Sequence, residues 1–348
     1  MKPALPPLPA QPLLLSMILA LGLTACSAQT DDTVPASGSS ASTDAPQATE
    51  TDGNSDDPAE TDADAAPAPM GTDIYLFTLY WEGGTPTLGA ALGHIGEDGY
   101  DNQPFFTTDG GVLYTSAGET GNTDIWRHDL TSGQQTQLTN TPDASEYSPK
   151  IPPAEAALSY LYQPPGGYAG NAYLADAANA NPRAAHQLAP VGYYAFSTDM
   201  RQVVTFYLGE PGTEGPFTLQ LIDRTTTPET VTEIAENPGR TFWRNPRGTG
   251  VYHSLADSEG EHMIHYLDFA TAEDTALFAL PPGVQDFVAA GLPDDRTGFF
   301  STHSDQLVYW TGEDWTPVGD LSGLTNVTRL ALSPDLSLIA IVAEDQID

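Results

Sequence analysis

Short apolar runs separated by polar turns fill the chain from residue 72 to its end. The clearest unit spans residues 103–139, where the runs Val112 to Tyr114 and Ile125-Trp126 are rich in β-branched and aromatic residues. Each run is bounded by Gly, Asp or Pro, which is typical of β-strands joined by tight turns. The pattern therefore predicts an all-β domain.

The turn in front of the first of these runs recurs along the chain at intervals of 41 to 48 residues. The six copies are Thr108-Asp109, Pro153-Ala154, Thr198-Asp199, Pro246-Arg247, Pro293-Asp294 and Pro334-Asp335. Four copies hold Asp, which suits an Asx-turn. An apolar strand follows every copy, and a further strand follows in five of the units, centred on Ile125, Tyr173, Leu219, Ile264 and Val308. Repeats of this length and pattern predict a propeller.

The sixth unit is incomplete, because the chain ends at Asp348 shortly after the run Leu338 to Val342. The first segment of the domain, with the runs Thr72 to Phe77 and Thr87 to Ile95, supplies the two missing strands. Strands from the two ends would then pair and close the ring. We expect an all-β, six-bladed β-propeller whose N- and C-terminal strands share the closing blade, although spacing alone leaves five or seven blades open.

The repeat resembles the TolB-like, WD-repeat-like family of β-propellers. The family signature is a Pro-x-x-Ser-Pro-Asp-Gly turn, an apolar strand and an Asp-Ile-Tyr/Trp strand. Residues 104–110, Ser333-Pro334-Asp335 and Asp124-Ile125-Trp126 carry it most clearly. The resemblance covers residues 72–348 and implies the fold. It does not extend to TolB itself, because a linker stands where TolB has an α/β domain.

Residues 1–25 have the pattern of an export signal. The apolar run Leu13 to Leu23 is too short to span a bilayer and fits a signal-peptide core. It ends in Leu23-Thr24-Ala25-Cys26, which resembles the lipobox of bacterial lipoproteins and implies lipid attachment at Cys26. An ordinary signal peptide with an incidental cysteine is the alternative. Cys26 is the only cysteine, so it forms no intramolecular disulfide.

The segment 26–70 consists of the lipid-attachment cysteine and an acidic stretch without aromatic residues. Such a stretch buries too little apolar surface to fold, so we expect a disordered linker followed by a propeller over 71–348. Ser27 after the cysteine favours the outer membrane, by analogy with enterobacterial sorting. We therefore expect a cell-envelope protein that faces the periplasm or the cell surface.

The chain is strongly acidic, with 47 Asp and Glu against 11 Lys and Arg. Ten of these acidic residues and one basic residue precede residue 71, which leaves the propeller with a charge of −27. Such a surface repels nucleic acid and anionic lipid headgroups and attracts cations or basic partners. Adaptation to a salt-rich environment explains the acidity equally well.

No catalytic signature stands out. The chain has no Gly-x-Ser-x-Gly elbow and no phosphate loop. His262 and His265 are three residues apart on an expected strand, where they face opposite sides and cannot bind one metal ion together. We expect no catalytic residue, no metal ligand and no cofactor. If the protein were instead a propeller enzyme, calcium is the cation that its site would hold.

The candidate binding residues are those directly before each innermost strand, because in propellers they line one mouth of the central channel. They are Asn102, Tyr147, Tyr193, Arg240, Asp286 and Arg329. Two arginines in so acidic a domain predict a mouth that is less negative than the rest and binds a ligand or peptide. Solvated loop residues without a function are the alternative.

Three classes of function remain at this point. The first is a monomeric, non-enzymatic scaffold that binds an envelope protein or a small molecule. The second is a propeller enzyme of the lactonase or sugar dehydrogenase type, with a metal or cofactor at the channel mouth. The third is a propeller that accompanies a separate catalytic polypeptide. The lack of catalytic motifs favours the first class.

Overall fold

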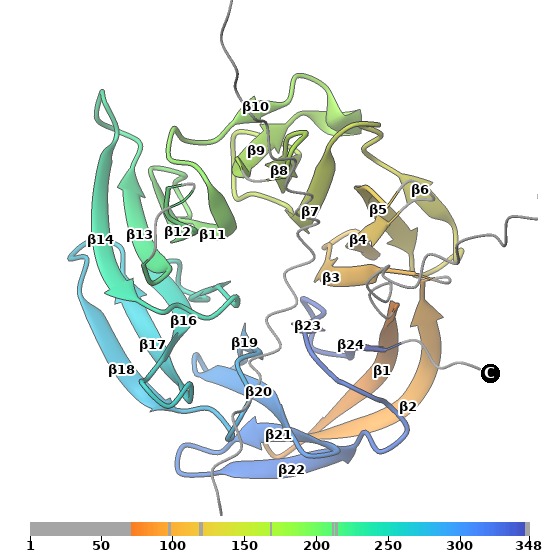
Figure 1. Cartoon of the computed structure of the whole chain (residues 1–348). Coiled ribbons are helices and arrows are strands. Elements are labelled where there is room, and N and C mark those ends of the chain that lie inside the picture. The colour runs from red at the N-terminus through yellow and green to blue at the C-terminus, as the bar shows by residue number, and fades with distance from the viewer. Residues whose placement is uncertain are drawn as a thin grey trace, which may run out of the picture. The chain divides into compact units, whose positions relative to one another are not determined.

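The computed structural model describes residues 71–96, 99–117, 121–167, 169–210, 212 and 215–344. Over these residues the chain forms six four-stranded antiparallel sheets around one central axis (Figure 1). The prediction of an all-β, six-bladed propeller is confirmed. Within the described residues the 3-10 turn η1 (Ala177–Asn179) is the one helical element, and no helix could cross a bilayer. The predicted signal peptide, Cys26 and the linker lie outside the described residues.

Five blades are each built from four consecutive strands. The first two, with their strands in chain order, are β3 (Asp101–Phe106), β4 (Gly111–Ala117), β5 (Thr123–Asp129) and β6 (Gln135–Gln137), then β7 (Ser145–Lys150), β8 (Leu158–Gln163), β9 (Asn171–Ala175) and β10 (Arg183–Ala184). The next three are β11 (Val191–Phe196), β12 (Gln202–Tyr207), β13 (Thr218–Asp223) and β14 (Thr230–Glu236), then β15 (Trp243–Arg244), β16 (Gly250–Ala256), β17 (His262–Asp268) and β18 (Asp274–Ala279), then β19 (Phe287–Gly291), β20 (Thr297–His303), β21 (Gln306–Trp310) and β22 (Trp315–Asp320). The first strand of each blade lies nearest the axis (Figure 1).

The closing blade joins the two ends of the propeller. Its strands, from the axis outward, are β23 (Leu330–Leu332), β24 (Leu338–Glu344), β1 (Thr72–Glu82) and β2 (Thr85–Ile95). Strand β24 pairs with β1 continuously, from Thr72 opposite Glu344 to Thr78 opposite Leu338. The expected closure by strands from both ends of the domain is therefore confirmed.

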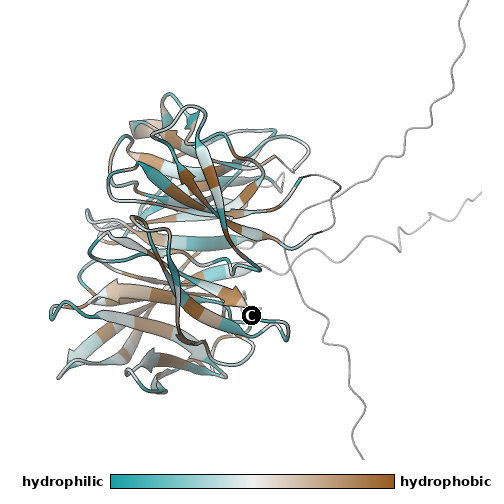
Figure 2. Cartoon of the chain, turned by 90° about the vertical axis from the view of Figure 1, so that its left-hand side faces the viewer, coloured by the Kyte–Doolittle hydropathy of each residue, from teal (hydrophilic) through white to brown (hydrophobic). Residues whose placement is uncertain are grey.

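The core lies between neighbouring blades, and strand β24 shows why. Its side chains alternate between two faces, as in any strand. Ala340 and Val342 pack with Val112 and Tyr114 of the next blade, whereas Ile339 and Ile341 pack with the blade before it. Figure 2 shows apolar residues along the strands of the blades and mostly polar residues at the turns. Each blade thus buries both faces of its sheet.

The repeated turn between the innermost and second strands has a defined hydrogen-bond pattern. Ser197 Oγ donates to Asp199 Oδ1 at 2.8 Å, and Asp199 Oδ1 accepts the Arg201 backbone N–H at 3.1 Å. Ser333 and Asp335 repeat the first contact at 2.7 Å. The predicted Asx-turn is confirmed at these positions, and the pKa of each Asp is lowered, chiefly by the Ser hydroxyl. This turn fixes the direction in which each second strand leaves the channel.

One interface between blades holds a buried carboxyl group. Glu146 of β7 is 1% exposed, and the Thr139 hydroxyl lies 3.1 Å from both Glu146 Oε2 and Asp124 Oδ1 of the preceding blade. Burial raises the pKa of Glu146 to about 7, and the neighbouring Asp124 adds to the increase. The folded protein therefore holds a proton here that the unfolded chain releases at lower pH.

We expect Glu146→Gln to stabilise the propeller at alkaline pH. Between pH 4.5 and pH 7 the folded state binds more protons than the unfolded state, so this group makes the free energy of unfolding fall as pH rises. The neutral amide removes that dependence. At pH 8 the variant should be more stable than the wild type by on the order of 2 kcal/mol, and near pH 4.5 the two should be equal. A stability difference from urea denaturation that does not change with pH would contradict this assignment.

Candidate functional site

The six predicted mouth residues lie at the inner edges of six different blades. Asn102, Tyr147 and Tyr193 lie inside the innermost strands β3, β7 and β11, so the prediction that they precede these strands was wrong. The strands begin one or two residues earlier than their apolar pattern suggests, because polar residues also pair in the ladder. Asp286 and Arg329 lie directly before β19 and β23, as predicted, and Arg240 lies three residues before β15.

Arg329 links side chains from three blades. Its Nη1 donates to Asn102 Oδ1 at 2.8 Å, and its Nη2 donates to the Tyr193 hydroxyl at 3.0 Å. The guanidinium also lies 5.8 Å from the centre of the Tyr193 ring. Among the ion pairs between described residues none involves Arg329. Its positive charge is thus oriented by neutral groups and is not neutralised by a carboxylate in contact with it.

Arg240 and Asp286 form a second pair at the same mouth. Arg240 Nε donates to Asp286 Oδ1 at 2.9 Å, and Nη2 donates to Oδ2 at 2.5 Å. Asp286 is 5% exposed. Burial by itself raises the pKa of Asp286, but the charges of Arg240 and Arg329 and the hydrogen bonds from Arg240 lower it to a net value below its usual range. The carboxylate therefore stays ionised and holds Arg240 in place.

Tyr100, which the sequence analysis did not select, belongs to the same cluster. Burial raises the pKa of Tyr100 to about 12, and the charges of Arg329 and Arg240 partly oppose this increase. The Tyr193 and Tyr147 hydroxyls also act on Tyr100, so Tyr147 lies near the cluster although no direct hydrogen bond is described for it. Hydrogen bonds thus connect five of the six predicted residues in two groups, whereas Tyr147 is linked to them only through its effect on Tyr100.

The backbone is unusual directly after two of the mouth residues. Gln103, which follows Asn102, has φ 58°, and Ser148, which follows Tyr147, has φ 52°. Both are non-glycine residues in the left-handed region, which is uncommon and clusters at functional sites. Gln103 Oε1 accepts a hydrogen bond from the Ser148 backbone N–H at 2.6 Å, so the two strained positions support each other across blades. The strain also interrupts the strand register and redirects the side chains before it.

A cavity of about 320 Å³ leads from the mouth along the channel. Tyr193, Arg240 and Arg329 line its mouth, and Lys150, Trp243 and Arg244 line it further along their strands. This volume is at the lower end of the range of about 300–1,000 Å³ for small-molecule pockets. The sequence analysis did not select Lys150 and Arg244, although both occupy the last positions of innermost strands.

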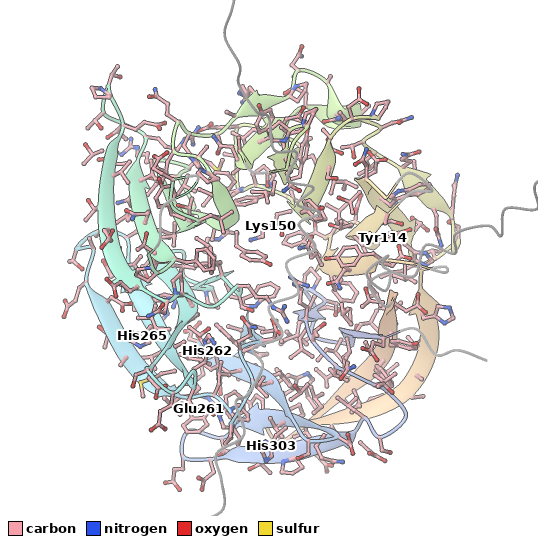
Figure 3. All side chains as sticks on the ribbon, in the orientation of Figure 1. Tyr114, Lys150, Glu261, His262, His265 and His303 are labelled. Carbon is pink, nitrogen blue, oxygen red and sulfur yellow. The ribbon has the colours of Figure 1, made fainter. Side chains whose placement is uncertain are left out.

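Lys150 is the lysine that Figure 3 shows on the inner side of the ring, near the axis. Its Nζ donates to the Tyr194 backbone carbonyl and lies 4.7 Å from the centre of the Tyr194 ring. Burial, together with a smaller effect of the Arg244 charge, lowers the pKa of Lys150 to about 7. No ion pair among the described residues involves Lys150. A protonated amine has three N–H donors, and the Tyr194 carbonyl accepts from one of them.

The histidines form no metal centre in the described part of the chain, where no suitable group of three ligands occurs. His262 Nδ1 lies 3.2 Å from Ser254 Oγ, whereas His265 Nδ1 lies 2.8 Å from Asp274 Oδ2, so the two rings have different partners (Figure 3). Asp274 Oδ1 also contacts His253 Nε2 at 2.8 Å. This bridge was not predicted from the sequence, although His253 and His265 lie opposite each other in the hairpin β16–β17.

Similar solved structures are propellers of several functions. A protein assigned as TolB in Agrobacterium tumefaciens is 15% identical, with a TM-score of 0.56 over 80% of this chain and 100% of its own. TolB from Acinetobacter baumannii is 13% identical, with a TM-score of 0.46 over 79% of this chain and 64% of its own. An oligogalacturonate lyase in complex with manganese is 13% identical, with a TM-score of 0.48 over 80% and 98%.

These likenesses show the fold alone. The likeness to the Agrobacterium tumefaciens protein confirms the TolB-like propeller that the repeat predicts as a fold, and the low identity fits a protein other than TolB itself. No protein-family model and no curated protein matches the chain. The function must accordingly be argued from the channel mouth.

Proposed function

We propose that the chain is a lipid-anchored envelope protein whose propeller is a non-enzymatic binding scaffold, with the channel mouth as its binding site. The observation that carries the proposal is Arg329, a cation oriented by Asn102 and Tyr193 but not paired with a carboxylate. A prearranged, incompletely neutralised arginine is suited to binding an acidic group of a partner or ligand. The TolB-like fold supports a periplasmic or envelope setting, and the lipobox at Cys26 supports attachment to the outer membrane.

The acidic surface supports the same scheme. A propeller with a charge of −27 repels nucleic acid and other polyanions. We propose that an acidic ligand can bind only where it fits between the arginines of the mouth. We propose that the protein acts as a monomer and binds either an envelope protein or a small molecule. Replacing Cys26 by Ser should move the protein from the membrane fraction to the soluble fraction.

The binding proposal is tested by crosslinking the full-length protein in its host cell, followed by purification and mass spectrometry of bound proteins and metabolites. We expect Arg329→Gln to lose at least nine-tenths of a reproducible partner. Arg201→Gln is the matched control, because Arg201 is exposed and its Nε pairs with Asp199 at 3.6 Å. The same partners at the same yield in the wild type and in Arg329→Gln would overturn the proposal, and turnover of a bound substrate would favour the enzyme alternative.

A further inference from the structure

The cavity carries a concentration of positive charge that contrasts with the rest of the domain. Residues 71–348 contain ten basic residues, and four of them, Lys150, Arg240, Arg244 and Arg329, line this one cavity. No acidic residue lies among its described lining residues. Asp286 neutralises Arg240 from outside the lining, which leaves Arg244, Arg329 and Lys150 without a contacting carboxylate. Because the pKa of Lys150 is about 7, its amine is only partly protonated at neutral pH, and a bound anion would favour the protonated form.

These cations lie at two levels of the channel. Arg240 and Arg329 precede their innermost strands and act together on Tyr100 at the mouth. Lys150 and Arg244 end their innermost strands, and Arg244 is the charged group that acts on Lys150. Lys150 follows the mouth residue Tyr147 by three positions and ends β7, beyond the left-handed residue Ser148.

Aromatic side chains and prolines make up much of the cavity lining, beside the polar residues Gln103, Ser148, Thr241 and Asn245. Phe105, Phe196, Phe242 and Phe287 line the cavity together with Trp243 and several prolines. A ligand with an uncharged middle part and an acidic group at each end matches a cavity that has basic residues at two levels. Inorganic anions match only one level at a time, and a long acidic peptide exceeds the volume of about 320 Å³.

We propose that the cavity binds a linear dicarboxylate, with one carboxylate on Arg329 at the mouth and the other between Lys150 and Arg244. This inference names a ligand class for the site of the proposed function and therefore rests on it. The aromatic part of the lining covers the carbon chain, and each end forms charge-assisted hydrogen bonds. Lys150 supplies point charge at the far end and Arg329 supplies a planar fork at the mouth.

Isothermal titration calorimetry of the full-length protein in detergent tests the proposal, with succinate, glutarate, adipate, pimelate and suberate as probes. Affinity should rise with chain length to a maximum among the three longest acids. Heptanoate, which has the same carbon chain as pimelate but one carboxylate, should bind at least tenfold more weakly than pimelate. Equal affinity for all chain lengths, or for inorganic phosphate and pimelate, would overturn the proposal.

Variants assign the two ends. We expect Lys150→Met and Arg329→Gln each to weaken pimelate binding at least tenfold while leaving heptanoate bound by the remaining end; the matched control Arg201→Gln should change nothing. Circular dichroism checks that each variant is folded, and Lys150→Arg, which restores the charge, should recover most of the affinity. Unchanged pimelate affinity in Lys150→Met would overturn the proposal. If no dicarboxylate binds but Arg329→Gln loses its partner in cells, the proposed ligand class is wrong and the proposed binding function stands. If no dicarboxylate binds and Arg329→Gln keeps its partners, both proposals are wrong.

Discussion

A chain that stops before Leu338 should not form a folded propeller. Strand β24 pairs with β1 on one side and β23 on the other, and residues 339–343 are completely buried. Burial of Ile339, Ile341 and Val342 alone contributes roughly 5–9 kcal/mol, at about 1.5–3 kcal/mol for each side chain. The whole stability of a protein is typically about 5–15 kcal/mol, so loss of this strand removes most or all of it.

The measurement is thermal unfolding followed by near-ultraviolet circular dichroism. We expect no cooperative transition for the truncated chain. Deletion of residues 31–41 removes the same number of residues from the predicted linker and should leave the melting temperature unchanged. A cooperative transition in the truncated chain within a few degrees of the wild type would show that strand β24 does not close the ring.

Replacing Arg240 by Met should cost the propeller about 3–5 kcal/mol of unfolding free energy. The substitution leaves the buried Asp286 carboxylate without its bidentate partner, and an uncompensated buried charge costs this much. The pKa of Asp286 is lower in the folded wild type than in the unfolded chain. The pair therefore stabilises the folded state at pH values above the unfolded pKa, and this stabilisation is lost as pH falls through the folded pKa. The deficit of the variant should therefore shrink in acid.

Two further variants separate this effect from binding. Arg240→Met combined with Asp286→Leu removes both charges and should recover most of the lost stability, as apolar replacements of buried pairs do. Arg329→Gln should cost less than Arg240→Met, because Arg329 has neutral partners that are left near the channel. If Arg240→Met and Arg329→Gln were equally destabilised, the two arginines would not have the separate roles described here. Arg240 is thus a poor probe of binding, and Arg329 is the better one.

Much of the fold could be predicted from the sequence because propeller blades repeat a local pattern. The turn that holds Asp in four of the six units, the apolar strand after it and the incomplete last unit are all visible as residue types at intervals of 41 to 48 residues. Closure followed from the two strands that residues 72–95 add to the last unit. These features depend on short stretches of chain, so they need no knowledge of distant contacts.

The site was only partly predictable. Position in the repeat identified Asn102, Tyr193 and Arg329, but their contact across the channel depends on how six blades converge. Lys150 was visible as the single lysine after the signal peptide, yet nothing in its local sequence indicates that it lines a cavity. Neither the left-handed backbone at Gln103 and Ser148 nor the pairing of Arg240 with Asp286 has a local signal.

We propose that ligands bind inside the channel and not on the outer strands. Hydrogen–deuterium exchange of the full-length protein, with and without pimelate, measures the location directly. We predict slower exchange in the innermost strands β7, β11 and β15, which carry Lys150, Tyr193 and Arg244, and no change in the outermost strands β14, β18 and β22. Protection confined to the outermost strands, or no protection of the innermost strands at saturating pimelate, would contradict the claim.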